Sequence, residues 1–215
     1  MTSRTLTLLL ALASIAPKAR GDVSIAHVFN DHMVLPRDVA LPVWGRAAAG
    51  EKVTVEFGGQ KKSATAGGNG SWLVTLDALP AATEPKELTV SGSKTDRPIL
   101  LRDVLVGDVW LAGGQSNMAT GAGAAGAEAD TPLVRFTAVE TYYPGTRPAD
   151  LKGRCRWRAA DAASAGSCSG TALYFARQVQ AKLGVPVGLV VSAAGGSRAE
   201  AWTRRATLDA GDGFG

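Results

Sequence analysis

The segment that most constrains the fold runs from Val104 to Met118 and reads VLVGDVWLAGGQSNM. Its apolar residues form a short, nearly continuous run bounded by turn residues, which is typical of a strand buried on both faces of a parallel sheet. Gly113 and Gly114 let the backbone turn sharply where that strand ends, because glycine reaches positive φ without steric penalty. We therefore expect Ser116 to lie in the crevice at the carboxyl end of the strand, where open α/β sheets bind ligands.

The residues around Ser116 do not by themselves establish its chemistry. A serine after two glycines is usually part of a turn or caps a helix. The segment also differs from the G-x-S-x-G nucleophile elbow, because Met118 occupies the position of the last glycine. This difference disfavours a lipase-like esterase and leaves Ser116 open as either a nucleophile or a turn residue.

A strand, a helix and a second strand are predicted further along the chain. Leu133 to Val139 has the composition of a strand, and a helix capped by Ser169 or Thr171 follows a long loop and ends at Gly184. Val187 to Val191 then forms another buried strand, so the order predicts a parallel sheet. If this strand lies parallel to the one ending near Ala112, Ser116 and the pair Gly195-Gly196 can converge at one edge.

The part of the chain before residue 102 has a different pattern. Apolar and polar residues alternate at period two around Val53 to Phe57, Trp72 to Leu76 and Leu88 to Val90, as in strands with one buried face. The run from Gly67 to Gly70 favours a hairpin. We expect residues 22–101 to form a small β-sandwich or jelly-roll-like module, whose surface either binds glycan or, as we favour, packs on the next domain.

Residues 1–19 have the pattern of a secretory signal. Arg4 supplies a positive start, and Leu6 to Ala16 is apolar but too short to span a bilayer. The alternative is an uncleaved anchoring or buried segment. Cleavage of a signal predicts a secreted protein, periplasmic or extracellular, with no membrane attachment afterwards.

The charge and the cysteine content of the chain limit which kinds of partner, metal or cofactor we expect it to bind. The net charge is +4, with Lys and Arg scattered among Asp and Glu, and we infer no nucleic-acid binding. Cys155 and Cys168 either form a disulfide in an exported protein or remain two partly buried thiols. No histidine lies near them, so we expect no metal site and no cofactor.

Three separated blocks resemble one family. LRDVLVGDVWLAGGQSNM resembles the nucleophile block of the sialate O-acetylesterase family, which are carbohydrate esterases of the SGNH-hydrolase type. Leu183 to Trp202 resembles the family's second block, and Phe29 to Phe57 resembles its amino-terminal β domain. The resemblance implies an α/β fold in which residues 102–215 form the front part of an SGNH-type parallel-sheet domain. It also implies that Ser116 attacks an acetyl ester on a sugar or glycan, while amides of Ser116 and of Gly195 or Gly196 bind the oxyanion.

The resemblance is incomplete where a base is needed. The family's later Q-G-E and D-x-x-H blocks are missing, and the two histidines, His27 and His32, lie in the β module. A serine hydroxyl is a weak nucleophile until a base takes its proton. Two functions therefore stay open: an incomplete serine carbohydrate esterase, or a non-catalytic carbohydrate-binding or interaction protein that keeps the front of the fold.

Overall fold

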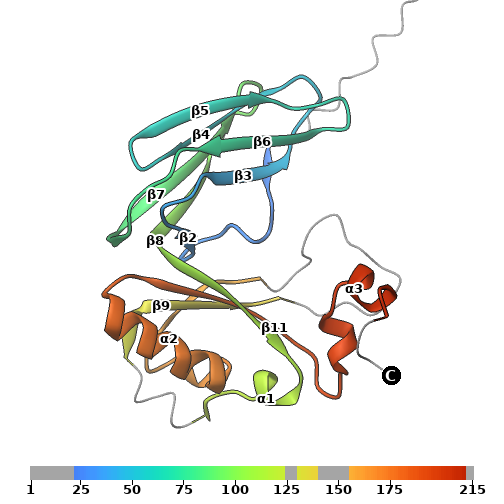
Figure 1. The fold of residues 1–215 in the computed structure, drawn as a ribbon. Coiled ribbons are helices and arrows are strands. Elements are labelled where there is room, and N and C mark those ends of the chain that lie inside the picture. Colours follow the sequence, from blue (N-terminus) through green and yellow to red (C-terminus); the bar gives the residue numbers. More distant parts are fainter. Residues whose placement is uncertain (1–21, 124–129, 140–154, 212–215) are drawn as a thin grey trace, which may run out of the picture.

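The computed structural model describes residues 22–123, 130–139 and 155–211. The predicted signal, residues 1–19, lies outside these ranges, as do residues 142–154 of the long loop predicted between residues 142 and 169. The described remainder of that loop contains a short strand, Arg158–Ala160. The described chain has two parts, a β-sandwich and an α/β layer structure, which one long strand connects (Figure 1).

Seven strands build the first part. They are β1 (Ser24–Ile25), β2 (Val34–Pro36), β3 (Leu41–Arg46), β4 (Lys52–Phe57), β5 (Gln60–Thr65), β6 (Ser71–Leu76) and β7 (Ala82–Gly92). Strands β1, β3 and β6 form an antiparallel sheet, which packs against the sheet that contains β7, β4 and β5. The alternating apolar residues point into the shared core, where Val43, Val55 and Leu76 have no exposed surface.

Strand β8 (Ile99–Gly114) belongs to both parts of the structure. Its first half pairs antiparallel with β7, and its second half pairs parallel with the last strand of the chain. The division predicted between residues 101 and 102 therefore falls inside a continuous strand. The segment from Leu101 to Met118, which resembles a nucleophile block, begins in the sandwich and ends just beyond the carboxyl end of β8 in the second sheet.

The second part contains the parallel strands predicted from the sequence. These are β9 (Thr131–Ala138) and β11 (Val187–Ala193), with the short antiparallel β10 (Arg158–Ala160) at the sheet edge, in the order β10-β9-β11-β8. Helix α2 (Gly170–Leu183) covers one face of this sheet and packs on β9 and β11 (Figure 1). The mixed α/β class expected from the sequence is confirmed.

The ends of α2 follow from its local sequence. The Ser169 hydroxyl accepts a hydrogen bond from the Ala172 amide, so Ser169 rather than Thr171 is the N-cap. Gly184 ends the helix with φ +68°, the left-handed conformation that glycine adopts easily. Ala172, Leu173 and Ala176 are buried, but Phe175 and Leu183 are nearly half exposed, so the apolar side chains of this helix are only partly covered.

The expectation that the strand is buried on both faces is right for only half of β8. Residues 104–107 are buried, whereas Trp110 is 44% and Leu111 is 74% exposed. Beyond Gly107, β8 pairs only with β11, and no described strand lies along its other edge. A strand at a sheet edge loses the neighbour that would cover its side chains, which explains the difference.

The cysteines are not joined to each other. Cys168 is a free, buried thiol, so the alternative with a Cys155–Cys168 disulfide is not formed. Cys155 is buried and lies 3.4 Å from the Thr137 hydroxyl, from Sγ to Oγ1. Burial raises the pKa of Cys168 to about 12, which keeps this thiol protonated.

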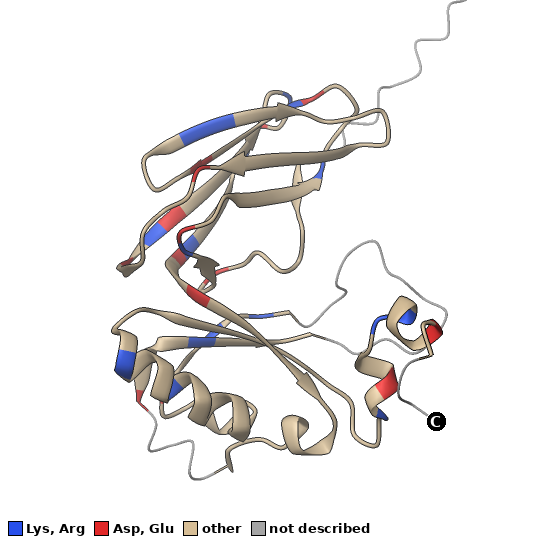
Figure 2. Ribbon diagram, in the orientation of Figure 1, with Lys and Arg blue, Asp and Glu red and all other residues tan. Residues whose placement is uncertain are grey.

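Charges of both signs occur on both parts of the described chain, with no basic stripe among the described residues (Figure 2). No helix within the described ranges is long and apolar enough to cross a bilayer.

Candidate active site at the carboxyl edge of the sheet

The two loops that carry the predicted site residues leave adjacent strands at the same edge. In the parallel pairing of β8 and β11, Gly114 lies opposite Ala193. Ser116 lies two residues after Gly114, and Gly195 lies two residues after Ala193. The Ala194 amide donates a 2.9 Å hydrogen bond to the Gly114 carbonyl. Residues some eighty positions apart in the sequence are thus neighbours in the fold, as the sequence predicted.

The glycines before Ser116 have separate roles. Gly114 has φ +154°, which side chains rarely adopt, and a Cβ there would lie 3.2 Å from the Met118 Cβ. A Cβ at Gly113 would lie 3.4 Å from the ring of Trp202. The sharp turn therefore depends on Gly114, whereas Gly113 leaves room for the tryptophan.

Ser116 is the first residue of a one-turn helix, α1 (Ser116–Ala119). It is exposed, and its hydroxyl donates a 2.6 Å hydrogen bond to Oε1 of Gln115. An amide oxygen accepts a hydrogen bond but is far too weak a base to take the proton. The described surroundings of Ser116 therefore present a hydroxyl without a base.

Gly195 and Gly196 form a tight turn directly after β11. The Ser197 amide donates to the Ala194 carbonyl at 3.2 Å, and Gly196 has φ +74°. A Cβ at Gly195 or Gly196 would meet no atom within 4 Å, so the space beside this turn is open. The amides of Ser116, Gly195 and Gly196 donate to no acceptor within the described chain. Unpaired N–H groups beside an open space are available to an oxygen of a ligand.

Trp202, whose position in the sequence is compatible with packing at the floor of the site or with a purely structural role, lies beside the turn. Its Nε1 donates a 2.9 Å hydrogen bond to the Ser197 hydroxyl, and that hydroxyl donates to the Ala194 carbonyl at 2.7 Å. The tryptophan, in the short helix η3 (Ala199–Trp202), thus links the turn to Gly113.

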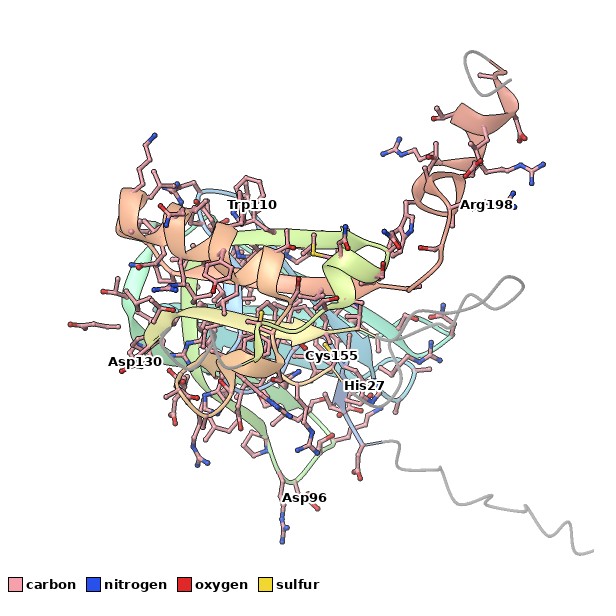
Figure 3. All side chains as sticks on the ribbon, turned by 90° about the horizontal axis from the view of Figure 1, so that it is seen from below. His27, Asp96, Trp110, Asp130, Cys155 and Arg198 are labelled. Atoms are coloured by element: carbon pink, nitrogen blue, oxygen red, sulfur yellow. The ribbon has the colours of Figure 1, made fainter. Side chains whose placement is uncertain are left out.

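Figure 3 shows this segment, marked by Arg198, extending away from the body towards α3 (Arg205–Asp209).

A small cavity beside α1 was not predicted from the sequence. It measures about 180 Å³ and lies between α1, the carboxyl ends of β9 and β11, and the start of α2. Its walls include Met118, Phe136, Ala193 and Ser169, and the Ser169 hydroxyl lies 3.2 Å from the Met118 sulfur. Isolated apolar residues on separate strands give no local signal for such a cavity.

The two histidines lie far from Ser116. His32 Nδ1 lies 2.6 Å from Oδ2 of Asp103, near the start of β8. From Asp103 to the end of β8 at Gly114, a strand rising about 3.3 Å per residue extends roughly 36 Å. His32 therefore does not reach Ser116, and His27 belongs to the same segment before β2. Within the described ranges, no group of three or more His, Cys, Asp or Glu could hold a metal ion.

Comparison with known families finds a match to the second part of the chain. A sequence model of the family described as "Carbohydrate esterase, sialic acid-specific acetylesterase" matches residues 106–210. The match covers β8 from Val106, α1 with Ser116, and the turn at Gly195-Gly196. The resemblance drawn from the three sequence blocks is confirmed.

Individual proteins match nearly the whole chain. The sialate O-acetylesterase of Rattus norvegicus is 31% identical over 227 residues, covering 95% of this chain and 42% of the rat protein. The Homo sapiens sialate O-acetylesterase is 27% identical and is covered to 43%. The crystal structure of a carbohydrate acetylesterase from Xanthomonas citri has 36% identity and a TM-score of 0.81, covering 88% of this chain and 44% of that chain. The chain thus spans about two fifths of the length of these relatives.

Proposed function

We propose that the chain provides the nucleophile side of a carbohydrate esterase of the sialic acid-specific acetylesterase type, which removes acetyl groups from sugars. The substrate is an acetylated sugar or glycan, with sialic acid as the first candidate. The observation that carries the proposal is the shared edge of β8 and β11, which brings the Ser116 hydroxyl and the Gly195-Gly196 turn to neighbouring positions.

The proposed reaction proceeds through a serine-bound acetyl group. Ser116 Oγ forms a bond to the ester carbonyl carbon, the bond from that carbon to the sugar oxygen breaks, and the sugar oxygen leaves with a proton. Water then hydrolyses the acetyl-serine to acetate and restores the hydroxyl. Unpaired amides of Ser116 and of Gly195 or Gly196 support the developing oxyanion, and one such donor typically contributes about 3 kcal/mol in the transition state.

The described chain does not supply a base that could take the proton of the Ser116 hydroxyl. Its present acceptor is the Gln115 amide oxygen, and both histidines of the sequence belong to the β module. We therefore expect the chain by itself to hydrolyse esters slowly. This same observation favours a second candidate, a carbohydrate-binding or interaction protein that keeps the front of the fold without turnover.

Hydrolysis of 4-nitrophenyl acetate by the purified chain tests the proposal, with Ser116→Ala measured beside it. We expect Ser116→Ala to lower the rate by at least about tenfold, because the unpaired amides beside Ser116 stabilise an oxyanion that forms there, and scattered residues lack such donors. Ser63→Ala is the matched control, since Ser63 is an exposed serine on β5. Mass spectrometry after incubation with substrate should find acetyl on the peptide that contains Ser116.

The two candidates give different results in this assay. An active chain whose rate does not depend on Ser116 would remove this serine from the mechanism. A chain that binds acetylated sugars without any turnover or acetyl-serine would support the non-catalytic candidate instead.

We also propose that the protein is exported, on the basis of the signal-like pattern in residues 1–19. Amino-terminal sequencing of protein recovered outside the cytoplasm is the test. A mature protein that still begins at Met1 would contradict it.

A further inference from the structure

The outward face of β3 and β6 carries large apolar side chains that the core does not use. These strands pair so that Trp44 lies opposite Leu73 and Arg46 lies opposite Ser71. Trp44 is 43% exposed and Leu73 is 56% exposed, although the adjacent Val43, Trp72 and Val74 are buried. We call Trp44, Leu73, Arg46, Ser71 and the adjoining Ser24 the β3–β6 face.

The indole of Trp44 is held in position while remaining accessible. The ring of Phe29, which is buried, contacts it edge to face at a centroid distance of 4.6 Å and an angle of 77°. A ring fixed on one side offers a rigid apolar platform, because a ligand that stacks on it immobilises few further rotamers.

Arg46 adds an uncompensated positive charge beside this platform. Its Nη1 donates to the Ser71 hydroxyl at 3.1 Å, and its Nη2 donates to the Asn69 carbonyl at 2.6 Å. Both acceptors are neutral, and no carboxylate in the described chain pairs with this guanidinium. Two of its five N–H groups are therefore used to orient it, and the rest remain available for an anion.

An open groove of about 920 Å³ lies over these residues. Trp44, Arg46, Leu73 and the hydroxyl-bearing Ser24 and Ser71 all line it. Its size lies within the range of about 300–1,000 Å³ that is usual for small-molecule sites. Apolar rings with a few polar groups at the margin suit a ligand that has one apolar face and several hydroxyls.

We propose that the β3–β6 face binds a carboxylated sugar residue of a glycan. The C–H groups of the sugar ring lie on Trp44, whose ring face carries partial negative charge, and the carboxylate pairs with Arg46. The choice of an acidic sugar rests on the charge of Arg46 and on the proposed function, because sialic acid carries a carboxylate. The site lies on the sandwich, away from the sheet edge that carries Ser116, so it holds a glycan at a second point.

Binding of two free sugars by ligand-observed NMR tests this proposal. The probes are N-acetylneuraminic acid, which is anionic, and N-acetylmannosamine, which is neutral. We expect the chain to bind the anionic sugar with a Kd of about 1 mM and to prefer it to the neutral sugar by about tenfold. Trp44→Ala should weaken binding at least about tenfold, and Arg46→Gln should abolish the preference.

Trp110→Ala is the matched control, because Trp110 is 44% exposed but lies on the α/β part beside α2 (Figure 3). It should leave sugar binding unchanged. Trp44→Phe keeps an aromatic ring next to Phe29 and should retain binding within about threefold, which separates loss of the platform from loss of folding. Circular dichroism melting curves for every variant complete this control.

Three results would overturn the proposal: no saturable binding at about 10 mM sugar, equal binding of the neutral sugar, or unchanged binding in Trp44→Ala. A face that docks a protein instead would give the first of these results. This test measures binding and not hydrolysis, so its result does not depend on whether Ser116 is active. In the same way, a failure of sugar binding at this face would not contradict the proposed esterase function.

Discussion

Asp103 is the residue that ties the two parts of the chain together. It accepts hydrogen bonds from Nη1 and Nη2 of Arg135 on β9, at 2.6 and 3.1 Å, and lies 2.6 Å from His32 Nδ1. Its φ of +55° is uncommon for a residue with a side chain, although Asp and Asn tolerate it best. Arg135 is buried, and this carboxylate pairs with its positive charge.

The charge of Asp103 should therefore stabilise the fold in a pH-dependent way. Burial raises the pKa of Asp103, but hydrogen bonds from Arg135 and His32 outweigh this effect and hold the pKa below its usual value. A carboxyl whose pKa is lowered on folding contributes stability above its unfolded pKa of about 3.9, and loses it as the pH falls through the folded value.

Asp103→Asn isolates this contribution, because asparagine keeps the shape and accepts positive φ. We expect the variant to be less stable than the wild type by about 2 kcal/mol at neutral pH, with the difference shrinking below about pH 4. Urea unfolding at both pH values measures it. Asp22→Asn, at an exposed position, is the control. A difference that is the same at both pH values would show that the charge of Asp103 is not involved.

The contrast between Asp103 and Ser169 shows what the sequence can predict at this scale. Ser169 caps α2 and Gly184 ends it through contacts within a few residues, so the local pattern predicted the end and narrowed the cap to Ser169 or Thr171. Asp103, His32 and Arg135 lie on three segments, and their meeting depends on how those segments pack. Likewise, the candidate nucleophile Ser116 was identified from a family resemblance, since its immediate neighbours give only a turn signal.

At the scale of elements, the pairing of β8 with β11 depends on a close contact between the backbone of Pro186 and the backbone at Gly107 and Asp108. The Asp108 amide donates to the Pro186 carbonyl at 2.9 Å, just before β11 begins. A Cβ on the neighbouring Gly107 would lie 2.0 Å from that carbonyl oxygen, which is a severe overlap with backbone. This glycine therefore sets the distance at which β11 joins β8.

Gly107→Ala should push the two strands apart and destabilise the fold by about 3 kcal/mol, in the upper range for overpacked positions. Thermal and urea unfolding measure the change. Gly68→Ala serves as the control, because a Cβ there would meet no atom within 4 Å. Equal stability of the two variants would show that the contact with Pro186 relaxes without cost.

Elements with strong local periodicity were predicted, and those that depend on distant partners were not. The strand before Gly113, the helix after Ser169 and the strand from Val187 all form near their expected positions. The short β10 exists only because β9 pairs with it, and the pattern of Arg158–Ala160 alone does not indicate a strand. The exposure of Trp110 and Leu111 was missed for the same reason, since burial is decided by neighbours rather than by the residues themselves.

At the scale of the whole molecule, the second half of β8 leaves an unusual surface. Trp110 contacts Phe175 of α2 edge to face, at a centroid distance of 5.0 Å, and both rings are more than 40% exposed. Leu111 lies one residue further along the same strand, whose outer edge has no partner strand in the described chain beyond Gly107. Unpaired edges with exposed apolar side chains promote association between molecules.

We therefore expect the purified chain to self-associate as its concentration rises, and Leu111→Lys to reduce this association. A lysine at an edge keeps other strands from pairing, because the charge would be taken out of water on contact. Sedimentation velocity over a wide concentration range measures the effect. Val39→Lys is the matched control, since Val39 is 50% exposed in the sandwich. A wild type that stays monomeric throughout, or an equal effect of both lysines, would show that the β8 edge does not drive association.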